Sequence, residues 1–550
     1  MQPAAVHPVR DEAGVLTSHS NRRQFVRGLA SAGLAVSLAR AQKRPARVTI
    51  DLSRVRADLD RRLFGSFLEH LGRAVYQGVY EPGSPLADSS GFRKDVAEEI
   101  RQMGVPTIRY PGGNFVSGYN WLDGVGPKKD RPRVLERAWN SIETNQFGTN
   151  EFIAWCKLVG TEPLLATNLG TGTPESSAAL VEYCNLEKGT RWSDLRRHHG
   201  YPSPHNVKYW CLGNEMDGRW QIGHMTAIEY GRKAADAARQ MRNVDRSTQL
   251  IACGSSGPTM TTYLEWDRQV LEECYNEVDA ISLHRYYRNA DNNPARYLSL
   301  NLDMERQIEE VIAVCDYVRG RMRSPKRLWL SFDEWNVWYR ARGGNGQRQE
   351  APRLLEEVYN LEDALLVGGT INTLLRQAER VRVACLAQIV NVIAPLMTST
   401  TQVLRQTIYY PYAWALKHSR GRVLDLAVDS QSYELPRAQA PGPPQFQPPR
   451  SEPVPYLDVA GTTDPKSGEC CLLVLNRDEA ERELELVWHD AAPTRVLTCE
   501  TLTGPDLRAA NTFDQPKRVI PQPLDPPKPG PKMTLKTPAR SYSVLRLATA

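Results

Sequence analysis

The chain has 550 residues, of which 69 are Lys or Arg and 63 are Asp or Glu, giving a formal net charge of +6. Its hydrophobic content of 41%, with 38 Gly and 38 Pro, excludes a wholly disordered, collagen-like or coiled-coil chain. The length exceeds the roughly 100–200 residues of one typical domain, so a large domain with a second unit is expected. Because Lys and Arg form no stripe along any predicted element, we expect no nucleic-acid partner.

The N-terminal residues 1–41 have the pattern of an export signal. The pair Arg22-Arg23 precedes a weakly apolar run over 28–39, which ends in a small-x-small tripeptide at 39–41. This order is typical of twin-arginine signals, so the sequence predicts a periplasmic or secreted protein. An ordinary amphipathic starting helix is the alternative. No other run approaches the ~20 apolar residues of a membrane span, so we expect no membrane anchor.

Residues 60–414 alternate short β-rich apolar runs with helical patterns. The predicted strands cover 63–68, 107–110, 163–167, 207–212, 250–254, 279–283, 327–332 and 383–389. Helical patterns lie between them, among others at 92–103, 150–159, 226–241, 303–319 and 352–377. Eight such units predict an α/β fold, a (β/α)8 TIM barrel. A doubly wound open sheet is the alternative, but no Gly-rich phosphate fingerprint follows the first strand.

Beyond residue 415 the pattern changes to short strands without long helices. Strand-like runs occur at 471–476, 483–488, 494–501 and 541–547. Closely spaced short strands indicate a C-terminal all-β sandwich over 415–550. The Pro-rich stretch 436–455 is expected to be a surface insertion in this domain.

Polar side chains follow most of the predicted barrel strands. In strand order they are Glu69 and His70, Asn114, Asn168, Asn214 and Glu215, then His284 and Tyr286, Glu334, and Gln388. The carboxyl ends of barrel strands converge on one face, where barrel active sites lie. Amides, carboxylates and aromatic rings suit a neutral ligand rich in hydroxyl groups, whereas a phosphate would ask for Lys and Arg.

Two carboxylates, Glu215 and Glu334, stand at the ends of apolar strands, where a buried charge is costly without a partner or a function. They belong to the fourth and seventh strands, on opposite sides of the barrel mouth. Retaining glycosidases need two carboxyl groups about 5–5.5 Å apart, one as nucleophile and one as acid/base. A structural ion pair with a nearby Arg is the alternative for either residue alone.

The sequence predicts neither a metal nor a cofactor. The zinc motif HExxH and the paired-cysteine motif CxxC are absent, and His198-His199 lies in a polar segment without further ligands. The expected partner is a saccharide.

Six motifs together resemble glycoside hydrolase family 51, the α-L-arabinofuranosidases. They lie in this order along the chain: FGSFLEHLG at 64–72, RYPGGNF at 109–115, WCLGNEMDG at 210–218, SLHRYY at 282–287, SFDEWNVWY at 331–339 and RQTIYYP at 405–411. The resemblance runs from about residue 47 to the C-terminus. It implies a jelly-roll-like sandwich to which the segment 42–59 contributes a strand, and it suggests a homo-oligomer.

The resemblance also implies roles for individual residues. Glu215 would be the general acid/base and Glu334 the nucleophile, with Arg109 orienting the nucleophile. Residues expected to bind the sugar are Glu69, Asn114, Asn214, His284, Tyr286, Trp338 and Gln388. Asn114 could instead be a turn residue after Gly112-Gly113, and Gln388 a buried strand amide.

The expected activity is therefore that of a retaining, exo-acting α-L-arabinofuranosidase that removes terminal arabinofuranosyl residues from arabinan or arabinoxylan saccharides. Another retaining glycosidase of the same clan, an endo-glucanase or a xylanase, is the nearest alternative. A non-catalytic polysaccharide-binding protein is a further one, against which the presence of both glutamates argues.

Overall fold

The computed structural model describes residues 44–339, 348–435 and 453–549, and the described residues from Ala46 onward form one compact unit. The predicted signal at 1–41 and most of the Pro-rich stretch 436–455 lie outside the described residues. Within the described ranges, no helix combines the length and the apolar character that a membrane crossing requires.

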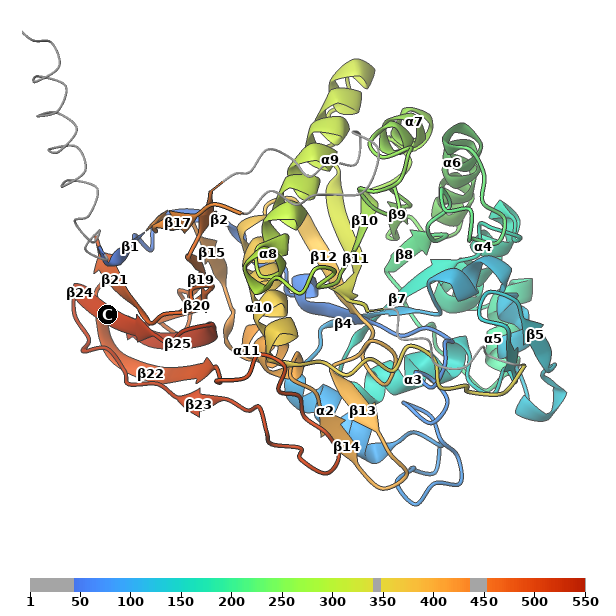
Figure 1. Cartoon of the computed structure of the whole chain (residues 1–550). Helices are drawn as coiled ribbons and strands as arrows, with labels where there is room; N and C mark the ends of the chain where they lie inside the picture. Colours follow the sequence, from blue (N-terminus) through green and yellow to red (C-terminus); the bar gives the residue numbers. More distant parts are fainter. Residues whose placement is uncertain (1–43, 340–347, 436–452, 550) are drawn as a thin grey trace, which may run out of the picture. The chain divides into compact units, whose positions relative to one another are not determined.

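Eight parallel strands close into a barrel in the order β10-β11-β12-β3-β4-β7-β8-β9 (Figure 1). Their bounds are β3 Gly65–Phe67, β4 Thr107–Tyr110, β7 Glu162–Thr167, β8 Tyr209–Leu212, β9 Gln249–Ala252, β10 Ala280–Tyr287, β11 Trp329–Val337 and β12 Val381–Ala387. The predicted (β/α)8 barrel is confirmed. The predicted first strand at 63–68 begins instead with a 3-10 turn, η1 (Arg61–Phe64), because the side chain of Asp60 caps it by accepting from the Arg62 N–H.

Helices connect the barrel strands. They are α2 Lys94–Met103, α3 Thr149–Val159, α4 Pro174–Asn185, α5 Arg191–His198, α6 Ala227–Val244, α7 Glu265–Cys274, α8 Pro294–Tyr297, α9 Leu300–Met322, α10 Leu361–Arg376 and α11 Tyr409–His418. The helix expected from residue 352 begins only at Leu361. There Asn360 and Asp363 cap each other's backbone N–H groups, which fixes the start of α10.

Short elements decorate the barrel loops. They are the 3-10 turns η2 Asn114–Gly118, η3 Trp121–Gly124 and η4 Lys128–Asp130, and the paired strands β5 Val134–Glu136 with β6 Ser141–Glu143 and β13 Leu396–Thr398 with β14 Val403–Arg405. The hairpin of β5 and β6 belongs to the loop after β4, so it lies at the carboxyl end of the barrel.

The remaining strands form two main sheets. The first has the order β16-β1-β21-β24 and the second β2-β15-β19-β20-β25-β22-β23. Their bounds are β1 Ala46–Ile50, β2 Val55–Asp58, β15 Arg422–Leu424, β16 Ala427–Asp429, β19 Leu457–Asp464, β20 Glu469–Asn476, β21 Arg482–Trp488, β22 Pro493–Leu502, β23 Gln522–Pro523, β24 Lys532–Thr537 and β25 Ser541–Thr549; a further short pair is β17 Ser432–Tyr433 with β18 Val454–Pro455. The predicted C-terminal all-β domain is confirmed.

Strand β20 contributes side chains to both apolar clusters, that of the barrel and that between the two sheets. Its side chains alternate, so Leu472 and Val474 join the apolar cluster between the two sheets, while Leu473 and Leu475 join the barrel cluster. Both faces of the strand are therefore buried, which is why its sequence is a continuous apolar run. Helix α11 spans the boundary predicted at residue 415, and we propose to place that boundary after His418.

A buried charge cluster, called the junction cluster below, joins the barrel helices to the sheets. Asp458 on β19 accepts hydrogen bonds from Arg376 of α10 and from Arg477, both at 2.7 Å. Asn301 of α9 and Asn372 of α10 also donate to it, at 3.0 and 3.1 Å. Although burial opposes it, the two guanidinium groups hold the pKa of Asp458 well below its ordinary value.

Candidate active site

The predicted site residues converge at the carboxyl ends of the barrel strands. Glu69 follows β3, Arg109 lies in β4, Asn114 begins η2 after it, Asn214 and Glu215 follow β8, His284 and Tyr286 lie in β10, Glu334 in β11, Trp338 follows β11, and Gln388 follows β12. Register pairs His284 with Glu334 across the two longest barrel strands. These strands extend beyond their predicted ends because they continue to pair with each other, through Tyr287 and Val337.

The carboxylate of Glu334 is held at both oxygens. Arg109 donates from Nη1 to Oε1 at 2.7 Å, and the hydroxyl of Tyr286 donates to Oε2 at 2.8 Å. Glu334 is 5% exposed, so its charge depends on these two donors rather than on water. An ionised, oriented and nearly dry carboxylate is the form that a nucleophile requires.

Arg109 is fully buried and organises the floor of the site. Besides Glu334, it donates from Nη2 to the Oδ1 of Asn214 at 2.7 Å, and its Nε lies 3.5 Å from Asp333. Asn214 is 1% exposed, and its Nδ2 has no hydrogen-bond partner among the described residues. A buried amide with an unused donor is costly unless a ligand accepts that hydrogen bond.

Glu215 accepts hydrogen bonds from two different donors. His284 contacts Oε1 from Nδ1 at 2.9 Å, and the indole N–H of Trp220 donates to Oε2 at 2.8 Å. Burial raises the pKa of Glu215 and the charge of Glu334 raises it further, while His284 and Trp220 oppose the shift. A raised pKa keeps a carboxylic acid protonated, as a general acid requires.

Glu215, His284 and Glu334 offer one oxygen or nitrogen each, and these atoms all lie within 4.8 Å of one another. The nearest oxygens of the two carboxyl groups are thus closer than the about 6.5–9.5 Å that inverting enzymes leave for a water, which favours a retaining pair. Three such atoms could also surround a cation. However, Arg109 and Tyr286 already take both oxygens of Glu334, which favours the acid–base interpretation.

His284 lies between three acids. Its Nδ1 lies 2.9 Å from Glu215 and 3.7 Å from Glu334, and its Nε2 lies 2.9 Å from Oδ1 of Asp333. The acids, Glu334 first, raise the pKa of His284 well above its ordinary value against the effect of burial, so the ring is protonated and both of its nitrogens donate. Asp333 completes its contacts by accepting from the Cys211 thiol at 3.3 Å.

Burial raises the pKa of the Glu69 carboxyl to near neutral pH. It is 3% exposed, and burial followed by the nearby charge of Glu334 raises its pKa to about 8. Its Oε1 accepts from the backbone N–H of Phe115 at 2.9 Å and from the indole N–H of Trp139 at 3.0 Å. A Cβ added to Gly113 would lie 2.6 Å from Oε2 of Glu69, so glycine is what lets the loop approach this acid.

Gln388 and Trp338 frame the same side of the cluster. The Oε1 of Gln388 accepts from the backbone N–H of Glu69 at 2.9 Å, so this buried amide fixes the chain that carries the acid. The rings of Trp338 and Tyr286 meet edge to face, with centroids 5.2 Å apart. Asn114 is next to Phe115, whose N–H holds Glu69.

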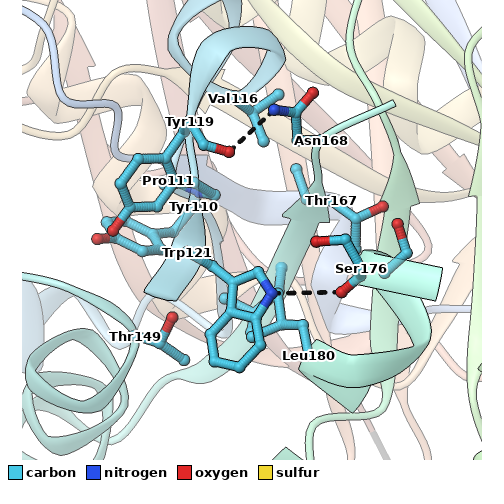
Figure 2. Close-up of a pocket in the computed structure, with 13 residues that line it drawn as sticks. Tyr110, Pro111, Val116, Tyr119, Trp121, Thr149, Thr167, Asn168, Ser176 and Leu180 are labelled. Atoms are coloured by element: carbon cyan, nitrogen blue, oxygen red, sulfur yellow. Dashed lines mark hydrogen bonds between the residues drawn. The ribbon is translucent and has the colours of Figure 1, made fainter. Parts of the chain in front are cut away.

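One predicted member of the polar ring does not belong to the cluster. Asn168 donates from Nδ2 to the carbonyl of Tyr119 at 2.9 Å (Figure 2). Its Oδ1 accepts from the N–H groups of Thr171 and Gly172. It lines a small cavity with Trp121, whose indole N–H donates to the carbonyl of Ser176. Asn168 therefore holds loops together.

Besides Asp333, two residues of the cluster were not predicted, Trp139 and Trp220. Each donates its indole N–H to a site carboxylate, Trp139 to Glu69 and Trp220 to Glu215. Trp139 and Glu69 are 70 residues apart in the sequence. Trp220 follows Glu215 by five residues within the loop after β8, and it is 54% exposed. The only available signal was an aromatic residue close to a candidate catalytic acid.

Comparisons with known proteins agree with this geometry. The family description "Alpha-L-arabinofuranosidase 1 domain" matches residues 99–301, and "Alpha-L-arabinofuranosidase C-terminal domain" matches residues 333–541. A relative named "Intracellular exo-alpha-(1->5)-L-arabinofuranosidase 1" from Bacillus subtilis is 47% identical over 480 residues, covering 86% of this chain and 93% of the relative. The chain belongs to family 51, the α-L-arabinofuranosidases.

Two further proteins support membership of family 51. The "Intracellular exo-alpha-(1->5)-L-arabinofuranosidase" of Halalkalibacterium halodurans is 49% identical over 440 residues, which are 79% of this chain and 85% of the relative. A solved family 51 α-L-arabinofuranosidase from Bifidobacterium longum matches with a TM-score of 0.85 and 37% identity, covering 92% of this chain and all of the other. The chain is thus a glycoside hydrolase with a barrel fold.

The prediction that this family 51 enzyme is exported is wrong. The two curated relatives described above are both named intracellular enzymes. The export signal was predicted from paired arginines before a weakly apolar run, and such a short pattern can occur without an export function.

Proposed function

We propose that this chain is a retaining, exo-acting α-L-arabinofuranosidase in which Glu334 is the nucleophile and Glu215 the general acid/base. The observation that carries the proposal is the separation of Glu215 and Glu334, each of which has a carboxylate oxygen within 4.8 Å of the other. The environments of the two acids support different roles, because Arg109 stabilises the charge of Glu334 while burial raises the pKa of Glu215.

In the first step a carboxylate oxygen of Glu334 attacks the anomeric carbon and forms a glycosyl ester. The bond to the leaving oxygen breaks, and the proton of Glu215 passes to that oxygen, so the leaving group departs as a neutral alcohol. The deprotonated Glu215 then accepts the N–H groups of His284 and Trp220, which stabilise the new charge.

In the second step Glu215 takes a proton from water, and the water oxygen attacks the anomeric carbon on the face that the leaving group vacated. The ester bond breaks and Glu334 recovers its electron pair beside Arg109 and Tyr286. Two displacements at one carbon give net retention, and the acid/base is protonated again for the next cycle.

Sugar binding falls to the remaining residues of the site. We infer that the free Nδ2 of Asn214 donates to a hydroxyl of the sugar, because otherwise this buried donor stays unsatisfied. Glu69, with a pKa of about 8, can present a protonated or an ionised oxygen to hydroxyl groups. Asn114, Gln388 and Trp338 would complete the pocket from neighbouring loops.

The proposed substrate is a terminal arabinofuranosyl group on an oligosaccharide or polysaccharide, and the relatives' names, which specify exo action, support this choice. We propose no cofactor and no metal for the reaction, since a glycoside is hydrolysed by two carboxyl groups alone. Assembly into a homo-oligomer also stays a prediction, which light scattering on the purified enzyme would test.

A panel of 4-nitrophenyl glycosides tests the function. We expect the α-L-arabinofuranoside to be hydrolysed with a kcat/KM at least about 100-fold above those of the β-xyloside and the β-glucoside, a discrimination that differences in a few sugar hydrogen bonds can supply. A preference for either of the other two glycosides would overturn the proposal in favour of the xylanase or endo-glucanase alternative.

A further inference from the structure

The hairpin of β5 and β6 carries a side chain into the sugar site from outside the barrel strands. Trp139, between the two strands, donates its indole N–H to Oε1 of Glu69 at 3.0 Å. The tip of the hairpin is shaped by Glu136, which accepts the backbone N–H groups of Ala138 and Trp139 at 2.7 and 2.6 Å. The hairpin therefore positions the indole N–H of Trp139, one of the two donors to Glu69.

The base of this hairpin is fastened to the barrel by one buried acid. Glu143, in β6, is 4% exposed, and its Oε2 lies 2.8 Å from Nδ1 of His70. Its Oε1 accepts from the hydroxyl of Tyr76 and, at 2.6 Å, from the backbone N–H of Asn145. Although burial opposes it, His70 and then Tyr76 hold the pKa of Glu143 below its ordinary value, so the acid is charged at neutral pH.

His70 follows Glu69 directly in the chain, and it influences the position of both residues that donate to Glu69. Through Glu143 it holds the hairpin that presents Trp139. Its ring also stacks on Phe115, with centroids 4.6 Å apart, and the backbone N–H of Phe115 is the second donor to Oε1 of Glu69. The other ring nitrogen, Nε2, lies 2.7 Å from the hydroxyl of Tyr110, which fixes the orientation of the ring.

We propose that His70 and Glu143 are positioning residues for substrate binding. Their contact locks the β5–β6 hairpin so that Trp139 and Phe115 hold the Glu69 carboxyl ready for the sugar. This inference rests on the proposed function only in that Glu69 contacts the substrate. Neither His70 nor Glu143 is placed against the sugar: both act through Trp139, and His70 acts also through Phe115.

A matched pair of substitutions separates the two contacts of His70. In His70→Asn the side-chain amide can still donate near the position of Nδ1 and keep Glu143. In His70→Gln the longer amide reaches the Tyr110 hydroxyl instead and leaves Oε2 of Glu143 without the donor at position 70. Both variants lose the ring stacked on Phe115, so the difference between them reports the contact with Glu143.

We expect His70→Gln to raise the KM for 4-nitrophenyl α-L-arabinofuranoside about tenfold, with kcat changed less than about threefold, because it removes uniform binding. His70→Asn should stay within about threefold of the wild-type KM. A merely structural role would lower the melting temperature and the active fraction, hence kcat, and leave KM unchanged. If His70→Gln does not fold, Glu143→Gln replaces it, with the same rise in KM expected.

A double-mutant cycle with Trp139→Phe decides whether His70 acts through the indole. Trp139→Phe alone should lower kcat/KM about tenfold, and adding His70→Gln to it should lower kcat/KM by no more than about a further twofold. Independent losses that multiply to about 100-fold would overturn the inference. Failure of the wild-type enzyme to hydrolyse the arabinofuranoside would instead overturn the proposed function, so the two failures are distinguishable.

Discussion

The junction cluster and the active site are both buried groups of acids and arginines, but their charges are balanced differently. At the junction, Asp458 faces two guanidinium groups and two amides, and every one of these contacts is a hydrogen bond of 2.7–3.1 Å. At the barrel mouth, three acids, Glu215, Asp333 and Glu334, share the cations Arg109 and His284. A fourth acid, Glu69, accepts only from the neutral N–H groups of Phe115 and Trp139.

This difference shows up in the pKa shifts. The junction lowers the pKa of its acid, Asp458, whereas the mouth raises the pKa of Glu215 and of Glu69, in each case through burial first. A cluster built for stability matches each buried charge, while a cluster built for acid–base work keeps an acid that is costly to ionise. We therefore expect the active site to contribute less to folding stability than the junction cluster.

The largest effect should come from removing the charge of the nucleophile. Glu334→Gln keeps the size of the side chain and an oxygen for Arg109, so the fold should stay intact. We expect kcat on the arabinofuranoside to fall by about 10⁴–10⁶, as when a covalent nucleophile is lost. The free energy of unfolding, measured in urea, should fall by no more than about 1 kcal/mol, because a repelling acid has been neutralised. A large loss of stability would assign Glu334 a structural role.

The same chemical change at the junction should have the opposite consequence. Asp458→Asn leaves the buried Arg477 without its counter-charge and Arg376 with Glu305 alone, which should cost about 3–5 kcal/mol of unfolding free energy at pH 7. Measured well below the melting temperature, kcat/KM should stay within about twofold of wild type. Equal stability of Asp458→Asn and Glu334→Gln would remove the distinction between the two clusters.

The pH dependence of stability separates the clusters further. The folded pKa of Asp458 lies below its unfolded value of about 3.9, so its contribution to stability is present above that pH. It is lost only as the pH falls through the folded pKa. The difference in unfolding free energy between the wild-type enzyme and Asp458→Asn should therefore begin to shrink below pH 4 and vanish only near the folded pKa, and a constant difference would contradict the account.

A smaller effect is expected from the indole that contacts the acid/base. Because the hydrogen bond from Trp220 lowers the pKa of Glu215, Trp220→Phe should raise that pKa. Glu215 must be protonated for the first step, so the alkaline limb of the kcat/KM profile should move to higher pH. We expect about a twofold change in kcat/KM at neutral pH, the size of one exposed hydrogen bond. A shift of the limb to lower pH would contradict this assignment.

The smallest effect should follow removal of metal ions. If Glu215, His284 and Glu334 act as acid, positioning group and nucleophile, prolonged dialysis against EDTA should leave kcat and KM unchanged. Loss of activity that an added divalent cation restores would favour the cation interpretation of this cluster.

The sequence predicted the barrel well because buried parallel strands leave a strong apolar signal. It predicted Glu215 and Glu334 because each follows such a run. Asp333 was harder to assign, since neighbouring residues of a regular strand point to opposite faces. The register of β11 against β12 shifts between Phe332 and Trp335, and this irregularity brings both acids to Arg109.

Contacts between distant loops left no local signal. Trp139 reaches Glu69 only because the β5–β6 hairpin folds back over the barrel mouth, and Glu143 finds His70 across 73 residues. The start of α10 was also placed too early, because the pattern from 352 onward is apolar but the reciprocal cap at Asn360 and Asp363 decides where the helix begins. Tertiary contacts and caps of this kind override periodicity.

Azide rescue of two alanine variants tests the central claim most directly. In Glu334→Ala, azide should take the place of the nucleophile and convert 4-nitrophenyl α-L-arabinofuranoside into the inverted β-azide. In Glu215→Ala, azide should attack the glycosyl ester on Glu334 and give the retained α-azide. The account predicts these two products of opposite configuration. Full activity of Glu334→Ala without azide, or the same anomer from both variants, would contradict it.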